Sequence, residues 1–269
     1  MVDVSIIMGI YNCASTLEDA INSLFNQTYK NWQLIMCDDA SNDETYNIAK
    51  KFSDKFENII LIKNDKNMGL NYTLNRCLEL VDTEFVARMD GDDISLPTRL
   101  EKEINFLRSN KKYSIVSADM IYFDRSGDWG RSNVKEYPQK KDLIKGTPFC
   151  HAPCMVRTEA YKKVGGYTVD KKLLRMEDYH LWYKMYAQGY VGYNIKEPLY
   201  KMRDDRDATK RRKYKFRINE AYVRYLIMRD FNLSKKNCIY ILRPLVVGLL
   251  PIIIYEKLHR NKIKNELLR

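Results

Sequence analysis

Five aspartates stand directly after two short apolar segments of this chain: Asp38, Asp39, Asp90, Asp92 and Asp93. Carboxylates brought close together repel one another unless a cation lies among them. Their hard oxygen atoms suit Mg²⁺ or Mn²⁺, and Mg²⁺ commonly binds substrate phosphates as well as protein ligands. Aspartate also favours helix N-caps and turns, so an isolated Asp-Gly-Asp would mean little. Because both groups follow apolar segments, we interpret them as the acidic rim of a site for a metal and a phosphate.

The order of the elements indicates where these aspartates lie. Apolar runs typical of buried strands occur at residues 3–10, 33–37, 58–62 and 85–89. Helical patterns separate them, and capping-box patterns at Ser15–Glu18 and Ser41–Glu44 predict where the first two helices begin. This alternation is typical of an α/β fold with a doubly wound, mostly parallel sheet flanked by helices. In such sheets the ligand binds beyond the carboxyl ends of the strands.

The second half of the chain has a less regular pattern. We expect a helix from Pro97, a strand at Tyr113–Phe123, a turn at Arg125–Gly130 and helices at 177–188 and 210–229. We divide the chain into an α/β domain, residues 1–206, and a helical extension, residues 207–269.

Eight segments in order carry a resemblance to a known family: 5–12, 23–29, 37–41, 67–70 with 74–75, 87–93, 94–100, 165–167 and 177–178. Together they resemble the family 2 glycosyltransferases of GT-A fold, inverting enzymes that build bacterial capsule, O-antigen and related glycans. Gly9 and Ala40 depart from the family's usual Pro and Gly, but both are small. The Gln-x-x-Arg-Trp signature of processive synthases is absent, which favours the transfer of one sugar at a time.

The resemblance implies where the nucleotide-sugar donor binds. It places the base and ribose, most simply those of a UDP-sugar, near Tyr11, Asn12, Asp39 and Asp90. An alternative for the neighbouring Asp38 is to hold the loop. Arg76 is a further candidate that could offset phosphate charge, and the alternative is a solvated helix face.

The resemblance also implies a metal, Mn²⁺ or Mg²⁺, with Asp92 as its ligand. A histidine near the end of the sheet often completes the metal shell in this family, and Asp205 stands at that place here. An equally open interpretation of Asp205 is a solvated acidic turn.

An inverting transferase needs a base that takes a proton from the acceptor hydroxyl. By resemblance this base is Asp178, and Glu177 beside it shapes the acceptor pocket. The alternative is that both carboxylates simply favour a helix N-terminus. Trp182 lies just beyond and could stack on a sugar, although aromatic residues at helical spacing more often form core.

The basic residues of the chain gather near its end. The formal net charge is +11, but residues 1–200 contain 27 Lys and Arg against 28 Asp and Glu, and residues 201–269 contain 19 against 7. The stretch Cys238–Tyr255 is strongly apolar but is interrupted by Arg243, Pro244 and Pro251. We expect it either to cover the catalytic domain or to bind an anionic membrane surface, which would suit a glycan acceptor linked to lipid. Nucleic acid is not expected as a partner, because no recognition motif accompanies the charge.

Location and function class follow from what accompanies these patterns. We see no signal peptide pattern and expect a cytoplasmic protein at the inner face of the plasma membrane. A sugar-phosphate nucleotidyltransferase would need a Gly-rich loop with a basic residue after the first strand, and residues 9–14 contain one Gly and neither Lys nor Arg. A non-catalytic membrane-binding scaffold is the other alternative, against which stands the presence of Asp90, Asp92 and Asp178 together.

Overall fold

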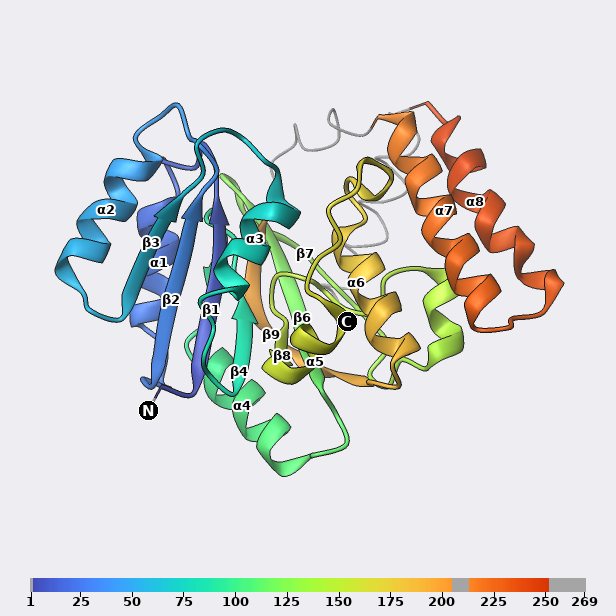
Figure 1. Cartoon of the computed structure of the whole chain (residues 1–269), viewed down its shortest axis with the longest axis horizontal. Coiled ribbons are helices and arrows are strands. Elements are labelled where there is room, and N and C mark those ends of the chain that lie inside the picture. The colour runs from blue at the N-terminus through green and yellow to red at the C-terminus, as the bar shows by residue number, and fades with distance from the viewer. Residues whose placement is uncertain (1, 205–212, 252–269) are drawn as a thin grey trace.

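The computed structural model describes residues 2–204 and 213–251 (Figure 1). Within these residues one mixed sheet of nine strands runs in the order β3-β2-β1-β4-β8-β6-β9-β5, and β7 pairs with β6. The strands are β1 Val4–Ile10, β2 Trp32–Asp38, β3 Ile59–Lys63, β4 Phe85–Arg88, β5 Ile94–Ser95, β6 Ile115–Asp124, β7 Gly127–Arg131, β8 Met155–Arg157 and β9 Gly192–Arg203.

The strands β3, β2, β1 and β4 are parallel, so their carboxyl ends meet at one edge of the sheet. Antiparallel pairing begins at β8, which joins β4 to β6, and the long β9 runs parallel to β6. The sheet therefore has a parallel half formed by the first 90 residues and a mixed half formed by the rest.

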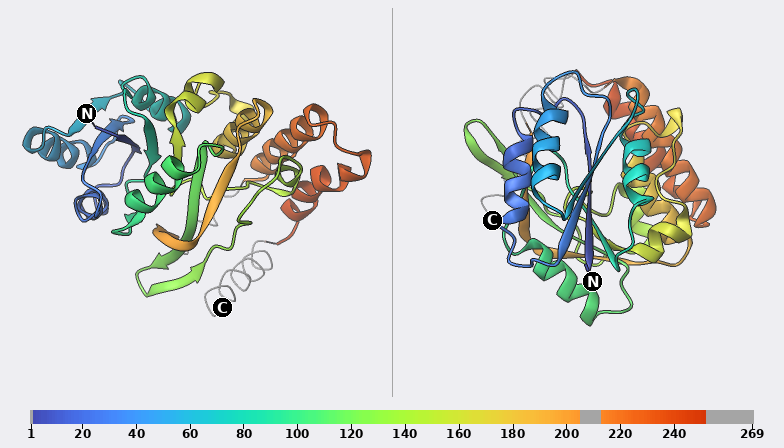
Figure 2. Two further views of the ribbon diagram at one scale, coloured as in Figure 1. Left: turned by 90° about the horizontal axis from the view of Figure 1, so that it is seen from below. Right: turned by 60° about the vertical axis from the view of Figure 1, so that its left-hand side comes forward.

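Helices cover both faces of the sheet, as the right-hand view of Figure 2 shows. They are α1 Leu17–Phe25, α2 Thr45–Lys55, α3 Leu70–Leu78, α4 Arg99–Ser109, α5 Thr158–Val164, α6 Glu177–Ala187, α7 Tyr214–Asp230 and α8 Cys238–Gly248. Short 3₁₀ helices, η1 Lys140–Lys145, η2 Lys171–Leu173 and η4 Lys235–Asn237, connect them.

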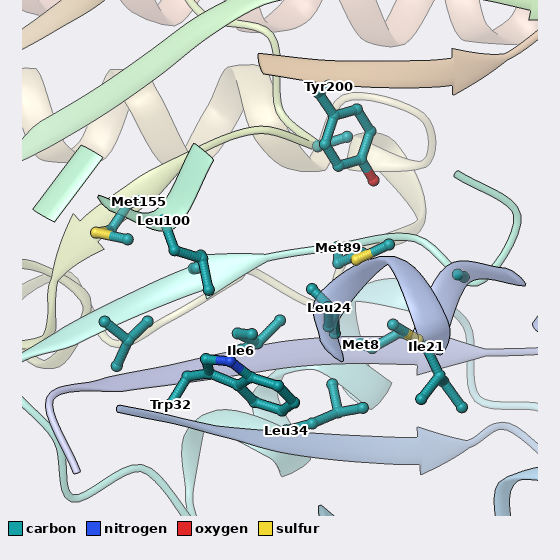
Figure 3. Packing of buried hydrophobic residues seen from close by; sticks show 14 of the residues in the cluster. Ile6, Met8, Ile21, Leu24, Trp32, Leu34, Met89, Leu100, Met155 and Tyr200 are labelled. Carbon is teal, nitrogen blue, oxygen red and sulfur yellow. The ribbon is translucent and has the colours of Figure 1, made fainter. Parts of the chain in front are cut away.

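The period of two along the central strands produces the two packed layers. Ile6 and Met8 of β1 face α1, α2 and α4, in the cluster drawn in Figure 3, whereas Ile7 faces α3, α5 and α6. A strand that is apolar on both faces is continuously hydrophobic in sequence, which is why the parallel half could be predicted from the sequence.

The strands and helices predicted up to Val81 are confirmed, but both capping boxes are wrong. The N-cap of α1 is Thr16 and not Ser15, no side chain caps the helix, and the Thr16 hydroxyl instead donates to the carbonyl oxygen of Gly91 at 3.0 Å. The Ser41 hydroxyl accepts the amide of Asn12 at 3.0 Å, and α2 begins only at Thr45. These hydroxyls instead connect loops at the carboxyl edge of the sheet.

The expected turn at Arg125–Gly130 is correct only at its start. The chain reverses after Asp124, and β7 already begins at Gly127. The sequence pattern also did not reveal β5, β9 or α5. Strand β9 is half exposed along much of its length and lacks a continuous apolar run, so its pairing with β6 is a tertiary effect.

A fully buried ion pair lies between the sheet and α4. Arg99 contacts Glu103 at 3.2 Å, and both side chains are inaccessible to solvent. Arg99 also donates to the carbonyl oxygen of Arg88 at 2.8 Å and packs over the ring of Tyr200. The Tyr200 hydroxyl in turn accepts the amide of Asp90 at 3.2 Å. These contacts hold the end of β4 and Asp90 in place from the α4 side of the sheet.

The helices α7 and α8 form an antiparallel hairpin at one end of the molecule (Figure 1). Helix α7 packs on η1 and α6 through Val223 and Ile227, and Arg224 donates to the carbonyl oxygen of Ile144 at 2.7 Å. Helix α8 rests on α7. None of the helices within the described ranges is long and apolar enough to cross a bilayer.

Candidate active site

Two adjoining cavities open at the carboxyl edge of the parallel strands. The first, of about 300 Å³, is lined by residues that follow β1 and β2, and the second, of about 610 Å³, by residues that follow β4 and precede α6. Leu70, Arg175 and Glu177 line both cavities and so mark their boundary. We call them the nucleotide cavity and the transfer cavity.

The nucleotide cavity receives two of the four residues that sequence assigned to nucleotide binding. Tyr11 and Asp39 line it, and Phe216 of α7 closes it from the C-terminal hairpin. Asn12 does not line it. The backbone of Asn12 is left-handed, with φ of 48°, and its side chain accepts the amide of Asn42 at 2.9 Å, so Asn12 shapes the loop.

Asp39 holds the next loop with both of its oxygen atoms. Oδ1 accepts hydrogen bonds from the amide of Met68 and the side chain of Asn64, each at 2.8 Å, and Oδ2 accepts the amide of Gly69 at 2.9 Å. Asp38, the alternative loop-holder, accepts the amide of Ser41 at 3.2 Å. Both aspartates therefore fix loops, and Asp39 does so at the wall of the cavity.

Asp90 lies in the transfer cavity, where it forms a bidentate ion pair with Arg88 at 2.6 and 2.8 Å. Burial alone would lower the pKa of Arg88, but the charge and hydrogen bonds of Asp90, together with the nearby Tyr167 and Tyr200, raise it overall. Arg88 therefore stays cationic, and its two hydrogen bonds hold the Asp90 side chain in a fixed orientation.

Asp92 also lines the transfer cavity, although a turn follows β4 and the two carboxylates do not share an extended strand. The Asp92 side chain reaches solvent in a recess crowded by protein. Desolvation in that recess, followed by the charge of Asp90, raises the pKa of Asp92 to about 6. No hydrogen bond from another described residue reaches its carboxylate. Asp93 points elsewhere and accepts the amide of Arg203 at 2.8 Å.

Glu177 and Asp178 form a coupled acidic pair in the same cavity. They open α6, and neither N-caps it. Burial and then the charge of Asp178 raise the pKa of Glu177 to about 7, and burial likewise raises the pKa of Asp178. Two half-buried carboxylates with raised pKa values are suited to exchanging a proton near neutral pH.

Three other predicted residues are placed differently. Trp182 is fully buried and lines neither cavity; its ring packs edge-on against Phe149 and His151, which do line the transfer cavity. It supports the cavity wall and offers no exposed face to a sugar. Arg76 donates to the carbonyl oxygen of Lys63 at 3.1 Å and also lies outside both cavities. Asp205 lies outside the described residues.

The sequence did not single out Arg88, Arg175 or His151 as site residues. His151 lines the transfer cavity and contacts the hydroxyl of Tyr167 at 2.9 Å, while burial and the charge of Arg88 lower its pKa well below the usual value. One feature of the sequence could have drawn attention to the two arginines. Arg88 lies two residues before Asp90, and Arg175 lies two residues before Glu177.

Comparison with known proteins decides the family. Residues 5–165, more than half of the chain, match the family described as Glycosyl transferase family 2. The chain belongs to this family. The predicted resemblance is thereby confirmed, and the chain is a glycosyltransferase; the nucleotidyltransferase alternative is discarded.

Two relatives cover nearly the whole chain. The putative glycosyltransferase EpsE of Bacillus subtilis (strain 168) is 41% identical over 264 residues, covering 98% of this chain and 95% of the relative. The UDP-Gal:alpha-D-GlcNAc-diphosphoundecaprenol beta-1,3-galactosyltransferase of Escherichia coli is 30% identical over 274 residues, covering 96% of each.

Two solved structures share the fold. TarS of S. aureus in complex with UDP-GlcNAc superposes with a TM-score of 0.68 at 19% identity, covering 92% of this chain and 71% of TarS. The mannosyltransferase PcManGT of Pyrobaculum calidifontis, in complex with GDP-Man and Mn²⁺, gives 0.59 at 19%, covering 91% and 68%. The predicted α/β fold of GT-A type is confirmed.

The coupled carboxylates give a prediction about stability. The pKa of Glu177 in the folded protein, about 7, exceeds its usual 4.5, so the fold favours the neutral form. This stabilising contribution is complete below pH 4.5 and is lost as the pH rises to about 7. Asp178→Asn removes the second cause of the shift and the second buried charge. We expect it to raise the free energy of unfolding by about 1–2 kcal/mol at pH 8 and by little at pH 4.5.

Urea unfolding across this pH range measures the effect. Glu159→Gln is the matched control, because Glu159 lies in the first turn of α5 and is exposed. Equal gains at pH 4.5 and pH 8 would contradict the coupling.

Proposed function

We propose that the protein transfers one sugar from a UDP-sugar to a hydroxyl of a glycan acceptor linked to lipid, with inversion at the anomeric carbon, in bacterial surface polysaccharide synthesis. The observation that carries the proposal is the meeting of Asp90, Asp92 and Asp178 in one cavity that adjoins a second cavity behind Tyr11 and Asp39. A nucleoside needs the nucleotide cavity, and a sugar with its acceptor needs the transfer cavity.

The donor and acceptor classes are supported by the chemistry in the relatives' names. A UDP-sugar and an acceptor carried on undecaprenyl diphosphate appear in the name of the E. coli relative, which aligns with nearly the whole chain. TarS, of the same fold, was solved with UDP-GlcNAc. Tyr11, nearly half exposed at the cavity, offers a ring face and a hydroxyl to the uridine.

Inversion follows from a base on the acceptor side. In this proposal Asp178 accepts the proton of the acceptor hydroxyl while the hydroxyl oxygen bonds to the anomeric carbon. The bond between that carbon and the UDP oxygen breaks, and UDP leaves with the electron pair. Glu177, whose pKa is raised to about 7, exchanges a proton with Asp178 near neutral pH and shapes the acceptor side of the cavity.

The donor set around Asp92 fits a divalent cation that substrate helps to hold. Asp92 has carboxylate lone pairs that accept no hydrogen bond from another described residue, and burial and the charge of Asp90 raise its pKa. Within residues 2–204 and 213–251 no three His, Cys, Asp or Glu side chains converge as a complete metal cluster. Mn²⁺ or Mg²⁺ held by Asp92 would take its other ligands from phosphates and water, as Mg²⁺ commonly does, and would supply positive charge to the departing diphosphate. Asp205 stays a predicted further ligand.

The base is tested by Asp178→Asn, which is nearly isosteric but cannot accept the proton. A positioned base contributes about 10²–10⁴-fold, so transfer to acceptor should fall by that factor while UDP affinity stays the same. UDP release with acceptor measures transfer, and calorimetry measures affinity. If Glu177→Gln loses the activity that Asp178→Asn retains, the base is Glu177. If both variants stay active, the inverting assignment is wrong.

The metal is tested by chelation and by Asp92→Asn. We expect EDTA to stop transfer, Mn²⁺ to restore it, and Asp92→Asn to weaken Mn²⁺ binding in the presence of UDP by at least about tenfold. Calorimetric titration of Mn²⁺ reports the binding directly. Asp54→Asn on α2 is the control, since Asp54 pairs only with exposed Lys50. Undiminished turnover in EDTA would remove the metal from the mechanism.

We further propose that the hairpin brings the enzyme to the cytoplasmic face of the membrane that carries the acceptor. One side of α8 presents a continuous apolar stripe in which each residue is more than half exposed: Ile239, Leu242, Val246 and Leu249. Exposed cations flank it at Lys235, Lys236 and Arg243. An apolar stripe bordered by cations suits the surface of an anionic bilayer.

Vesicle sedimentation tests this surface. Leu242→Glu with Val246→Glu should abolish binding to vesicles of anionic lipid, because both changes place charge on the inserted face. High salt should release part of the wild-type protein. Leu80→Glu is the control, since Leu80 is also an exposed leucine but follows α3. Equal sedimentation of all three proteins would refute this surface.

A further inference from the structure

The charges of the two cavities leave one arginine without a partner. Five acidic residues line the cavities, Asp39, Asp90, Asp92, Glu177 and Asp178, and three arginines accompany them, Arg88, Arg131 and Arg175. Arg88 pairs with Asp90, and Arg131 pairs with Asp119 at 3.0 Å. Among the described residues Arg175 has neither a hydrogen bond nor an ion pair from its guanidinium. Its five donors are therefore available to a ligand.

Arg175 also occupies the boundary between the cavities. Of the three residues that line both, it is the one with a positive charge. In a nucleotide sugar the diphosphate joins the nucleoside to the sugar. A donor with its nucleoside in the first cavity and its sugar in the second must carry its diphosphate past Arg175. A dianion there enters a cleft with more carboxylates than cations, so an unpaired guanidinium at the crossing is the group it needs.

The backbone at Arg175 points to a role for the side chain. Its φ is 66°, in the left-handed region that a residue with a Cβ rarely adopts and that glycine adopts freely. The position lies in the turn between η2 and α6, two residues before Glu177. An arginine held in an unfavourable conformation beside the proposed base indicates a function for its guanidinium.

We infer that the guanidinium of Arg175 binds the diphosphate of the donor and fixes the sugar against the Glu177–Asp178 pair. The inference rests on the proposed function, in that it takes a nucleoside diphosphate sugar as the donor. It adds a protein cation to the diphosphate site, beside the metal that Asp92 would hold in the proposed function.

The test compares UDP with uridine, because they differ only in the diphosphate. With the full chain and fixed Mn²⁺, calorimetry should show that Arg175→Gln weakens UDP about 10- to 100-fold, the scale for a hydrogen bond to a charged group. Uridine affinity should change less than about twofold. Arg175→Lys, which keeps the charge but loses the fork, should lie between. Arg125→Gln is the matched control, since Arg125 is exposed in the β6–β7 turn and lines neither cavity.

Arg175→Gly separates binding from loop geometry. Glycine relaxes the left-handed backbone, so the variant should fold at least as stably as wild type, and it should lose UDP affinity as Arg175→Gln does. If Arg175→Gly keeps wild-type UDP affinity, or if UDP and uridine weaken equally in Arg175→Gln, the inference is overturned. If wild type binds GDP or ADP instead, the same comparison is made with that nucleotide and its nucleoside. A wild-type protein that binds no nucleoside diphosphate would refute the proposed function itself, a result distinct from failure of Arg175 alone.

Discussion

The guanidinium of Arg99 lies where solvent does not reach, and the geometry of the active site depends on how its donors are satisfied. A buried cation is costly unless acceptors surround it. Here the Glu103 carboxyl lies 3.2 Å from Nε, and the carbonyl oxygens of Arg88, Ala152 and Cys154 accept from Nη2 at 2.8 to 3.4 Å, while Nη1 has no acceptor among the described residues. Those carbonyls belong to β4 and to the segment entering β8. The Arg99 side chain thus joins the parallel half of the sheet to the mixed half, close to Asp90.

Beyond the Arg99 contacts, hydrogen bonds within the protein join the loops around the two cavities to one another. Asp39 holds Met68 and Gly69, Thr16 holds Gly91, and Asn12 holds Asn42. Each contact joins loops that follow different strands. A site whose loops are already ordered loses less conformational entropy on binding, which leaves more of the interaction energy for affinity and orientation.

Sequence reasoning succeeded where one physical signal dominated. Buried parallel strands are continuously apolar, so β1 to β4 and the aspartates at their ends could be located, and Asp90, Asp92, Glu177 and Asp178 do meet in one cavity. It failed where a polar side chain had several possible partners. Nothing in the sequence shows that the Thr16 hydroxyl donates to Gly91 and does not cap α1. Nor does it show that both carboxylate oxygens of Asp39 accept hydrogen bonds from one loop. Strand β9 depends on pairing with β6, more than 70 positions earlier, and Phe216 lines a cavity together with Tyr11 and Asp39; local patterns do not report such contacts.

The walls of the two cavities are built in two different ways, and this decides what a substitution in each wall disturbs. Asp39, Asp90 and their neighbours are enmeshed in contacts that run to several elements, so a substitution there disturbs the whole rim. Ser132, Asn133 and Val134, which line the transfer cavity, lie after β7 in a stretch with neither helix nor strand. Replacements in that stretch leave the buried joint at Arg99 and the parallel strands untouched. Substitutions of Asn133 and Val134 can therefore reshape the transfer cavity while the contacts that hold Asp39 and Asp90 stay the same.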